Sequence, residues 1–260
     1  MNRIAWISVR NAVHYRRDAF AEGMKRLGYT VKFNLPAAPN GGDVLVTWNR
    51  FGPSDRIARE FERRGLPVLV AENGYLGNDL PGRPGERWYA LALNHHNGAG
   101  RWVEGGPERW DGFGIELRPW RLEGSEVVVL PQRGIGPPGV AMPLTWLRTG
   151  QKLGRVRRHP GQKETVALEQ DLRRARAVVT WGSGAALKAL AWGIPAFPGM
   201  PKWIGAPAAR RIEFMDQGPV RDDAARLAMF RSLAHAQANL DEIASGEALE
   251  KLLELHRNGR

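Results

Sequence analysis

A short Gly-Ser-Gly turn at residues 182–184, between an apolar run and an alanine-rich segment, has the composition of an anion-binding turn. Gly182 and Gly184 can adopt backbone angles that other residues avoid, and Ser183 offers a hydroxyl together with its N–H. A helix that begins after such a turn presents unpaired N–H groups and a partial positive charge, which suit a phosphate or a carboxylate. A tight turn in which Ser183 only caps the helix has the same sequence. Both interpretations fit the residues.

Basic residues gather upstream of this turn, where Arg157, Arg158 and His159 precede Pro160. A predicted strand ends at this cluster. Because ligands of open α/β sheets bind at the carboxyl ends of the strands, we expect the cluster and the Gly-Ser-Gly turn to face the same crevice. Together they predict an anion site. His159 alone fits equally well with a structural role, in which its ring makes hydrogen bonds at the end of the strand.

Several common motifs are missing from the chain. The turn is not a P-loop, because Gly-Lys-Ser/Thr is absent, and it lacks the third glycine of the dinucleotide fingerprint. The chain holds no cysteine, which excludes a disulfide framework, a thiolate zinc site and a cysteine nucleophile. Chemistry must therefore come from oxygen and nitrogen groups.

Glu72 is the first candidate for a general base. It follows an apolar run, and Gly74 allows a substrate to approach closely. His95 and His96 are the second candidates, as a base or as acceptor contacts. Adjacent histidines can also bind a metal, but no carboxylate stands at a clear ligand spacing, so no metal site is expected. Asp111 has the sequence context of an ordinary turn aspartate.

The charge of the chain points to an anionic partner. Its 260 residues include 38 lysines and arginines against 27 aspartates and glutamates, which gives a net charge of +11. Arginine dominates, and its planar guanidinium suits bidentate contacts to phosphates. A basic but simply solvated surface is the alternative.

The region from about residue 95 to 122 is rich in glycine, tryptophan and arginine and has no clear period, so we expect loops that carry a ligand surface. In such loops, exposed arginines can bind phosphates and exposed tryptophans can stack on bases. Tryptophans also line sugar sites and fill cores. The candidates for nucleic-acid or acceptor binding are Arg101, Trp102, Arg109 and Trp110, with Arg118, Trp120 and Arg121 nearby.

Apolar runs alternate with helical patterns along the chain, which predicts an α/β protein with parallel sheets. Strands are expected near residues 3–9, 30–34, 41–50, 66–74 and 88–93, and again near 125–130, 154–158, 177–181 and 194–197, with helices between most of them. The alternation of strand and helix patterns begins again near residue 125. We therefore expect two Rossmann-like domains facing a cleft, at residues 1–122 and 123–260. One or two amphipathic helices are expected after residue 221.

The chain has no run of 18 apolar residues and no signal-peptide pattern at its start, so no membrane span and a cytoplasmic location are expected. The sequence does not indicate an oligomeric state.

Three motifs, PQRG at 131–134, RRHP at 157–160 and the segment 171–197, together resemble the C-terminal half of GT-B glycosyltransferases. The likeness is strongest to the bacterial capsule-polysaccharide group related to Kdo and sialic acid transferases, and it covers roughly residues 126–200. In that group an His-Pro motif and a later serine turn bind the donor nucleotide and its phosphate. The matching residues here are Gln132, Arg133, Gly134, Arg158, His159, Pro160, Gly182, Ser183 and Gly184.

One residue departs from the pattern of these families. They usually carry a glutamate in the helix after the turn, and here Lys188 occupies that position. The change weakens the expectation of a ribose contact and favours an additional contact to phosphate.

The resemblance implies a glycosyltransferase that uses a UDP- or CMP-sugar as co-substrate, without a further cofactor, and supports Glu72 as base. Given the basic, tryptophan-rich composition, the preferred acceptor is a 5-hydroxymethylpyrimidine in DNA, as for a phage enzyme, which requires the base to leave the stack. The alternatives are a transferase acting on a cell-surface glycan or lipid carrier, and a non-catalytic module that binds nucleic acid or nucleotides.

Overall fold

The computed structural model describes residues 3–78, 87–96, 98–158 and 166–259. Contacts between residues group the chain into two compact units. The first unit holds Met1–His96, Gly100–Gly105 and Ala234–Arg260, and the second is built mainly from Gly106–Leu233. These units differ from the expected division after residue 122, because the segment before that residue contacts the second unit and the C-terminal helices contact the first.

The first unit contains a six-stranded sheet in the order β10-β5-β4-β3-β1-β2. Four strands are parallel, as the sequence pattern predicts: β1 (Ile4–Ser8), β2 (Thr30–Lys32), β3 (Val44–Trp48) and β4 (Val68–Asn73). The expectation of a wholly parallel sheet is wrong at one edge, where β5 (Trp88–Leu93) runs antiparallel to β4 and β10 (Gln237–Asn239) antiparallel to β5. A parallel connection requires a crossover, usually a helix, and the described residues between β4 and β5 form none.

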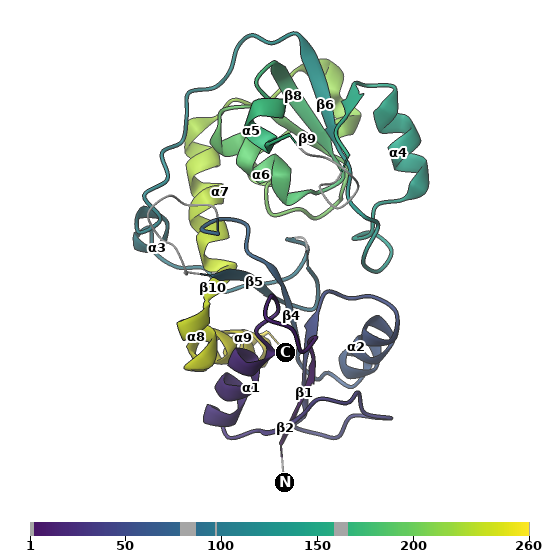
Figure 1. Ribbon diagram of the computed structural model, residues 1–260, viewed down its shortest axis with the longest axis vertical. Helices are drawn as coiled ribbons and strands as arrows, with labels where there is room; N and C mark the ends of the chain where they lie inside the picture. Colours follow the sequence, from purple (N-terminus) through teal and green to yellow (C-terminus); the bar gives the residue numbers. More distant parts are fainter. Residues whose placement is uncertain (1–2, 79–86, 97, 159–165, 260) are drawn as a thin grey trace. The chain divides into compact units, whose positions relative to one another are not determined.

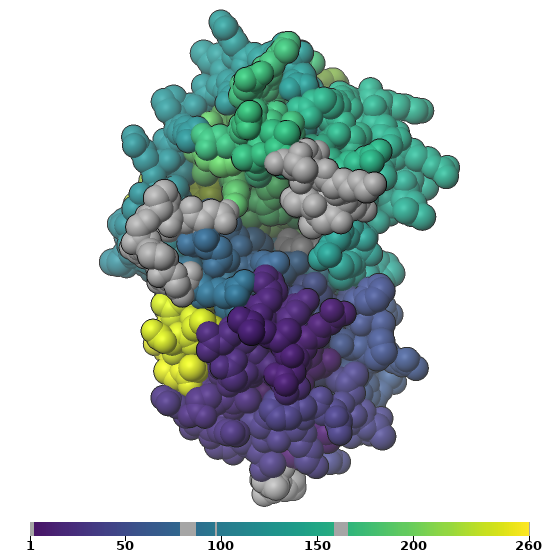
Figure 2. All heavy atoms as spheres, in the orientation of Figure 1, coloured from purple at the N-terminus to yellow at the C-terminus, as the bar shows by residue number. Residues whose placement is uncertain are grey.

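Helices cover both faces of this sheet (Figure 1). One face packs against α1 (Arg17–Arg26), α8 (Leu240–Ala244) and α9 (Glu247–Asn258), and the other against α2 (Pro53–Arg63). Strand β3 shows the division, because Val44 and Val46 face the first group of helices while Leu45 faces α2. Figure 2 shows the C-terminal residues in yellow beside the purple N-terminal segment.

Close packing on α1 explains why the C-terminal helices belong to the first unit. A Cβ atom added to Gly23 of α1 would collide with the carbonyl oxygen of Ile243 in α8. Glycine therefore lets the two helices approach at backbone distance.

The second unit contains a four-stranded sheet in the order β7-β6-β8-β9, and all of its pairings are parallel, as predicted. The strands are β6 (Glu126–Leu130), β7 (Arg155–Val156), β8 (Ala175–Thr180) and β9 (Ala196–Pro198). The helices are α3 (Glu108–Asp111), α4 (Leu144–Gln151), α5 (Leu168–Asp171) and α6 (Gly184–Ala191), with 3₁₀ turns at Ala206–Ala208 and Ile212–Gln217. Helix α7 (Asp223–His235) carries the chain back to the first unit.

No helix within the described residues is both long and apolar enough to cross a bilayer.

Candidate functional site

The carboxyl ends of the parallel strands in the second unit bring two predicted motifs together. The loop after β6 carries Gln132, and the turn after β8 carries Gly182. Nε2 of Gln132 donates to the carbonyl oxygen of Gly182 over 2.8 Å. The loop and the turn, fifty residues apart in the sequence, therefore form one surface.

Ser183 ends the turn and starts α6. Its Oγ accepts a hydrogen bond from the N–H of Ala185 at 3.3 Å, and its own N–H donates to Oγ1 of Thr180 at 2.9 Å. Thr180 in turn donates to the carbonyl oxygen of Leu130 at 3.0 Å. The capping role of Ser183 is therefore confirmed, and these bonds fix the turn against the end of β6.

Within the described residues, the first turn of α6 is open at Gly184. Gly184 is exposed, and a Cβ atom added there would meet no described atom within 4 Å. Its N–H belongs to the first turn, where helix geometry offers no intrahelical acceptor. The site can therefore accept an anion at the positive end of the helix, which leaves the phosphate interpretation as a proposal.

The expectation that Gly182 and Gly184 supply backbone angles that other residues avoid is wrong. Neither Gly182 nor Gly184 has a positive φ, so neither supplies a left-handed conformation. Gly182 is instead closely packed, because an added Cβ atom would lie 2.9 Å from Cε of Met200 and 3.3 Å from Cδ1 of Trp203, and the end of the Met200 side chain would have to shift. Gly134, in the loop after β6, does have a positive φ of 69°.

Cationic side chains border this edge. Lys188 lies one turn after Gly184 on α6, and burial lowers the pKa of its ammonium group. Arg133 and Arg158 are exposed and follow β6 and β7. A phosphate would suit such a surface, since each of these groups only donates hydrogen bonds.

Arg157 does not belong to the exposed cluster that the sequence suggested. It is buried, its Nη1 lies 3.0 Å from Oδ2 of Asp171, and its Nη2 donates to the carbonyl oxygen of Val166 at 2.7 Å. Its role is structural. His159 and Pro160 lie outside the described residues, so their predicted contacts stay predictions.

In the first unit, Glu72 is half-buried at the second-last position of β4. Asn73 follows it, and Oδ1 of Asn73 lies 2.9 Å from Nε2 of His14. Sequence reasoning missed His14, because the loop after β1 contains no motif. The signal that could have found it is topological: β1 and β4 are parallel, so their carboxyl ends share an edge.

The structure places His95 and His96 at the other end of β4. The N–H of Asn94 donates to the carbonyl oxygen of Val68, the first residue of that strand. Glu72 lies four positions further along, which corresponds to about 13 Å of extended chain. The two sets of candidate bases are therefore not brought together.

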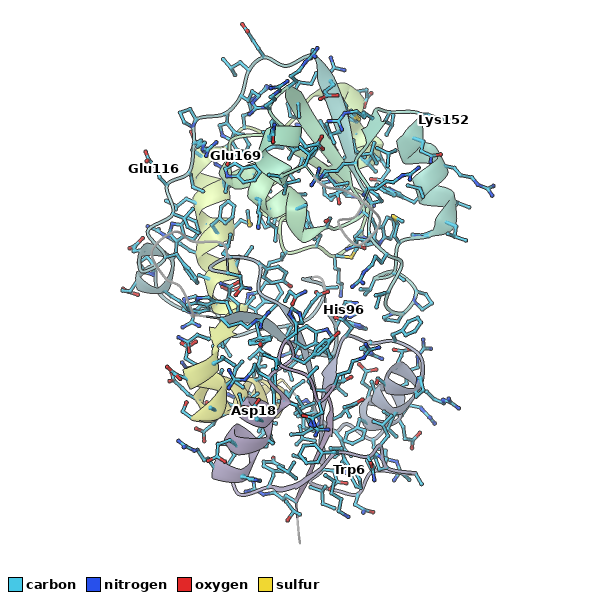
Figure 3. The ribbon with its side chains drawn as sticks, viewed as in Figure 1. Trp6, Asp18, His96, Glu116, Lys152 and Glu169 are labelled. Carbon is cyan, nitrogen blue, oxygen red and sulfur yellow. The ribbon has the colours of Figure 1, made fainter. Side chains whose placement is uncertain are left out.

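His95 contacts a buried ion cluster. Its Nδ1 lies 3.5 Å from Nη1 of Arg50, whose guanidinium also binds Glu62 and Asp55 at 2.6 to 3.0 Å. His96, labelled in Figure 3, is only 3% exposed. Among the described residues, no group of three or more histidines and carboxylates is arranged to hold a metal ion.

The four residues expected to form a nucleic-acid or acceptor surface are divided between the units. Arg101 and Trp102 belong to the first unit, and Arg109 and Trp110 to the second. Arg101 is exposed, and its backbone forms a bridge to Leu93. Trp102 and Arg109 are half-buried.

The expectation that Trp110 is exposed is wrong. The residue is 4% exposed, and its ring stacks on Phe230 with a centroid distance of 5.0 Å. Two neighbours of the predicted surface are also engaged. Arg121 donates from Nη1 to the carbonyl oxygen of Leu172 at 2.7 Å, and the guanidinium of Arg226 lies 4.0 Å from the ring centre of Trp120. These contacts all lie within the second unit.

Comparison with known proteins gives structural likeness only. No protein-family model matches the chain, and no curated protein matches it. The structure of Thermosulfurimonas dismutans KpsC, beta Kdo 2,7 transferase, superposes with a TM-score of 0.53 at 15% identity, over 96% of this chain and 100% of that one. The beta Kdo 2,4 transferase of the same KpsC gives 0.50 at 15% identity, over 92% and 98%. The chain shares this fold. An α/β architecture like that of these transferases is thereby confirmed, while a cleft between the two halves stays a prediction.

Proposed function

We propose that this protein is a glycosyltransferase that moves a sugar from a nucleotide-sugar donor to a hydroxyl group of a glycan. The observation that carries the proposal is the open, positively charged start of α6 at the carboxyl edge of a sheet, within a fold shared with two Kdo transferase structures. Both the site and the fold suit donor phosphate binding.

In this proposal the donor phosphate binds at the first turn of α6. Its charge is balanced by Lys188 and by the exposed guanidinium groups of Arg133 and Arg158. Gln132 and Ser183 hold the turn in place through the hydrogen bonds described above. Donors that are fixed before the reaction stabilise developing charge without reorganisation, which is the largest contribution to many enzymatic rates.

The transfer step then follows. The oxygen of the acceptor hydroxyl bonds to the anomeric carbon of the donor sugar, and the bond from that carbon to the phosphate oxygen breaks. The hydroxyl proton passes to Glu72, and the electron pair leaves with the nucleotide phosphate. The nucleotide sugar, with UDP or CMP, is a co-substrate, and the proposal includes no metal or further cofactor.

A glycan is preferred over DNA as acceptor. Both solved structures that share the fold bear the names of Kdo transferases. The case for DNA relied on exposed aromatic rings for base stacking, and Trp110 is buried against Phe230. The basic surface alone does not distinguish a nucleic acid from other anions.

Two substitutions at one position test the donor site. Aspartate and asparagine cap helices about as well as serine, so Ser183→Asp and Ser183→Asn should both preserve α6. If a phosphate binds at this turn, only the aspartate repels it. We expect the Asn variant to keep most of the donor affinity and the Asp variant to lose it at least about tenfold, as measured by calorimetry with CMP- and UDP-sugars.

Three outcomes are informative. Stabilisation of the wild type by a nucleotide sugar, together with transfer to an oligosaccharide detected by mass spectrometry, supports the proposal. Equal donor affinity of the two Ser183 variants would contradict the binding of the donor phosphate at this turn. Added mass on hydroxymethylated duplex DNA, without transfer to any glycan, would replace the glycan by DNA.

A further inference from the structure

His14, on the loop after β1, is an exposed histidine whose two ring nitrogens are both engaged. Its Nε2 lies 2.9 Å from Oδ1 of Asn73, and its Nδ1 lies 2.6 Å from Nη2 of Arg87. Asn73 is the last residue of β4, and Arg87 precedes β5, which pairs with β4. Three distant segments of the sequence therefore meet at one imidazole.

These two contacts determine the tautomer of His14. A guanidinium only donates hydrogen bonds, so Nδ1 accepts from Arg87 and carries no proton. Nε2 then carries the proton and donates to Oδ1 of Asn73. Within the described part of the chain, Nδ2 of Asn73 and the other N–H groups of Arg87 donate to no protein atom.

The imidazole is also supported from other sides. Its centre lies 5.1 Å from that of the Tyr15 ring and 6.1 Å from that of Trp48, both in edge-to-face geometry. The hydroxyl of Tyr89 donates to the carbonyl oxygen of His14 at 2.9 Å. Burial raises the pKa of Tyr89, which keeps this hydroxyl protonated.

Such support is unusual for an exposed loop residue. Side chains at the surface ordinarily change rotamer within nanoseconds, whereas binding sites hold their polar groups through surrounding packing and hydrogen bonds. The arrangement around His14 is of the second kind. It fixes two donor-bearing side chains, Asn73 and Arg87, at a sheet edge where α/β proteins bind ligands.

We propose that Asn73 and Arg87 bind a sugar ring of the acceptor through their remaining N–H groups, and that His14 is the positioning residue that holds both. The inference rests on the proposed glycosyltransferase function and names its acceptor subsite. Neighbouring N–H donors match the oxygen atoms of adjacent hydroxyl groups. Asn73 directly follows Glu72, so a sugar bound here lies at the end of β4 that carries the proposed base.

Two substitutions of His14 test this role. His14→Phe keeps an aromatic ring beside Tyr15 and Trp48 but removes both hydrogen bonds. His14→Gln can restore them, because its amide nitrogen donates to Asn73 and its amide oxygen accepts from Arg87. Transfer rates are measured over a range of glycan acceptor concentrations at saturating donor, and donor hydrolysis without acceptor is measured separately.

We expect His14→Phe to raise the acceptor KM at least about tenfold while donor hydrolysis stays unchanged, and His14→Gln to return KM to within about threefold of the wild type. If His14→Phe does not fold, Arg87→Met provides the same comparison, with the same expected rise in KM. An unchanged acceptor KM in the folded variant, or a Gln variant no better than Phe, overturns the inference while the proposed function stands. A wild-type protein that neither hydrolyses nor transfers from any donor overturns the proposed function itself.

Discussion

Gln132 and Gly182 are joined by a hydrogen bond of 2.8 Å from a side-chain amide to a backbone carbonyl, which couples the loop after β6 to the turn that starts α6. The other amide atom, Oε1 of Gln132, is buried and accepts no hydrogen bond within the described residues. Among the described residues, Gly182 is therefore the hydrogen-bond partner that orients this amide. A residue that offers only acceptors at this position would oppose the carbonyl oxygen.

Replacement of Gln132 by glutamate should therefore destabilise the protein more than replacement by methionine. Gln132→Met removes one hydrogen bond, at a cost of about 0.5–1.5 kcal/mol. Gln132→Glu adds a partly buried carboxylate beside an acceptor, and we expect a cost of about 1–3 kcal/mol. Urea unfolding of both variants at neutral pH measures the difference. A glutamate variant as stable as the methionine variant would show that the amide does not couple the two segments.

The two glycines of the turn should respond differently to alanine. At Gly184 the new Cβ atom meets no described atom and φ is ordinary, so Gly184→Ala should stabilise the protein by about 0.4–1 kcal/mol. At Gly182 the Cβ atom would lie 2.9 Å from Cε of Met200, the flexible end of a side chain that can shift, so Gly182→Ala should cost at most about 1 kcal/mol. Thermal unfolding measures both.

Measuring the donor affinity of the same variants distinguishes an effect on packing from an effect on phosphate binding. If a phosphate approaches the first turn of α6, Gly184→Ala should weaken nucleotide-sugar binding in spite of its greater stability. Calorimetry on the folded variant measures this affinity. An alanine variant with unchanged affinity would move the phosphate away from Gly184.

Much of the fold could be predicted from the sequence, because apolar runs reveal buried strands. The runs around β3, β4, β6 and β8 predict all four strands and their parallel pairing. Strand β10 could not be predicted in this way. Gln237–Asn239 has no apolar run, and its pairing with β5 depends on a contact between residues about 150 positions apart in the chain.

The candidate site was predictable only in part, for the same reason. The composition of the Gly-Ser-Gly turn predicts it, but the close contact between Gly182 and Met200 exists only in the folded chain. Arg157 has the local sequence of an exposed cluster, and its partner Asp171 lies fourteen residues away. His14 forms a hydrogen bond with Asn73, which lies 59 residues away in the sequence. Residue types indicate possible chemistry, while tertiary contacts decide which side chains are available for it.

Lys188 should make stability depend on pH in a way that methionine does not. Burial lowers its pKa in the folded protein, so the unfolded chain binds this proton more tightly. Stability should therefore rise as pH increases from the lowered folded-state pKa toward the ordinary lysine value of 10.5. Lys188→Met removes this contribution and should be more stable than the wild type at neutral pH.

Urea unfolding of both proteins between about pH 7 and 10 measures the effect, since other groups contribute equally to both profiles. A bound phosphate favours the ammonium form, so the Met variant should also bind the donor more weakly. Parallel pH profiles for the two proteins would contradict the assignment of the shift to Lys188.

The ion cluster around Arg50 provides the sharpest stability prediction, because a matched surface arginine shares one of its partners. The Arg50 side chain is 2% exposed and pairs with Asp55 and Glu62, whereas the Arg59 side chain is 54% exposed and, among the described residues, pairs with Asp55. Arg50→Met leaves Glu62 without this cation, while Asp55 keeps its ion pair with Arg59. We expect Arg50→Met to cost about 1.5–3 kcal/mol and Arg59→Met less than about 1 kcal/mol. Chemical denaturation measures both, and similar losses would mean that the cluster is solvated in solution. Because Arg50 also donates to the carbonyl oxygen of Asn94 and contacts His95, the Arg50 variant should in addition loosen the segment after β5, which faster amide exchange there would reveal.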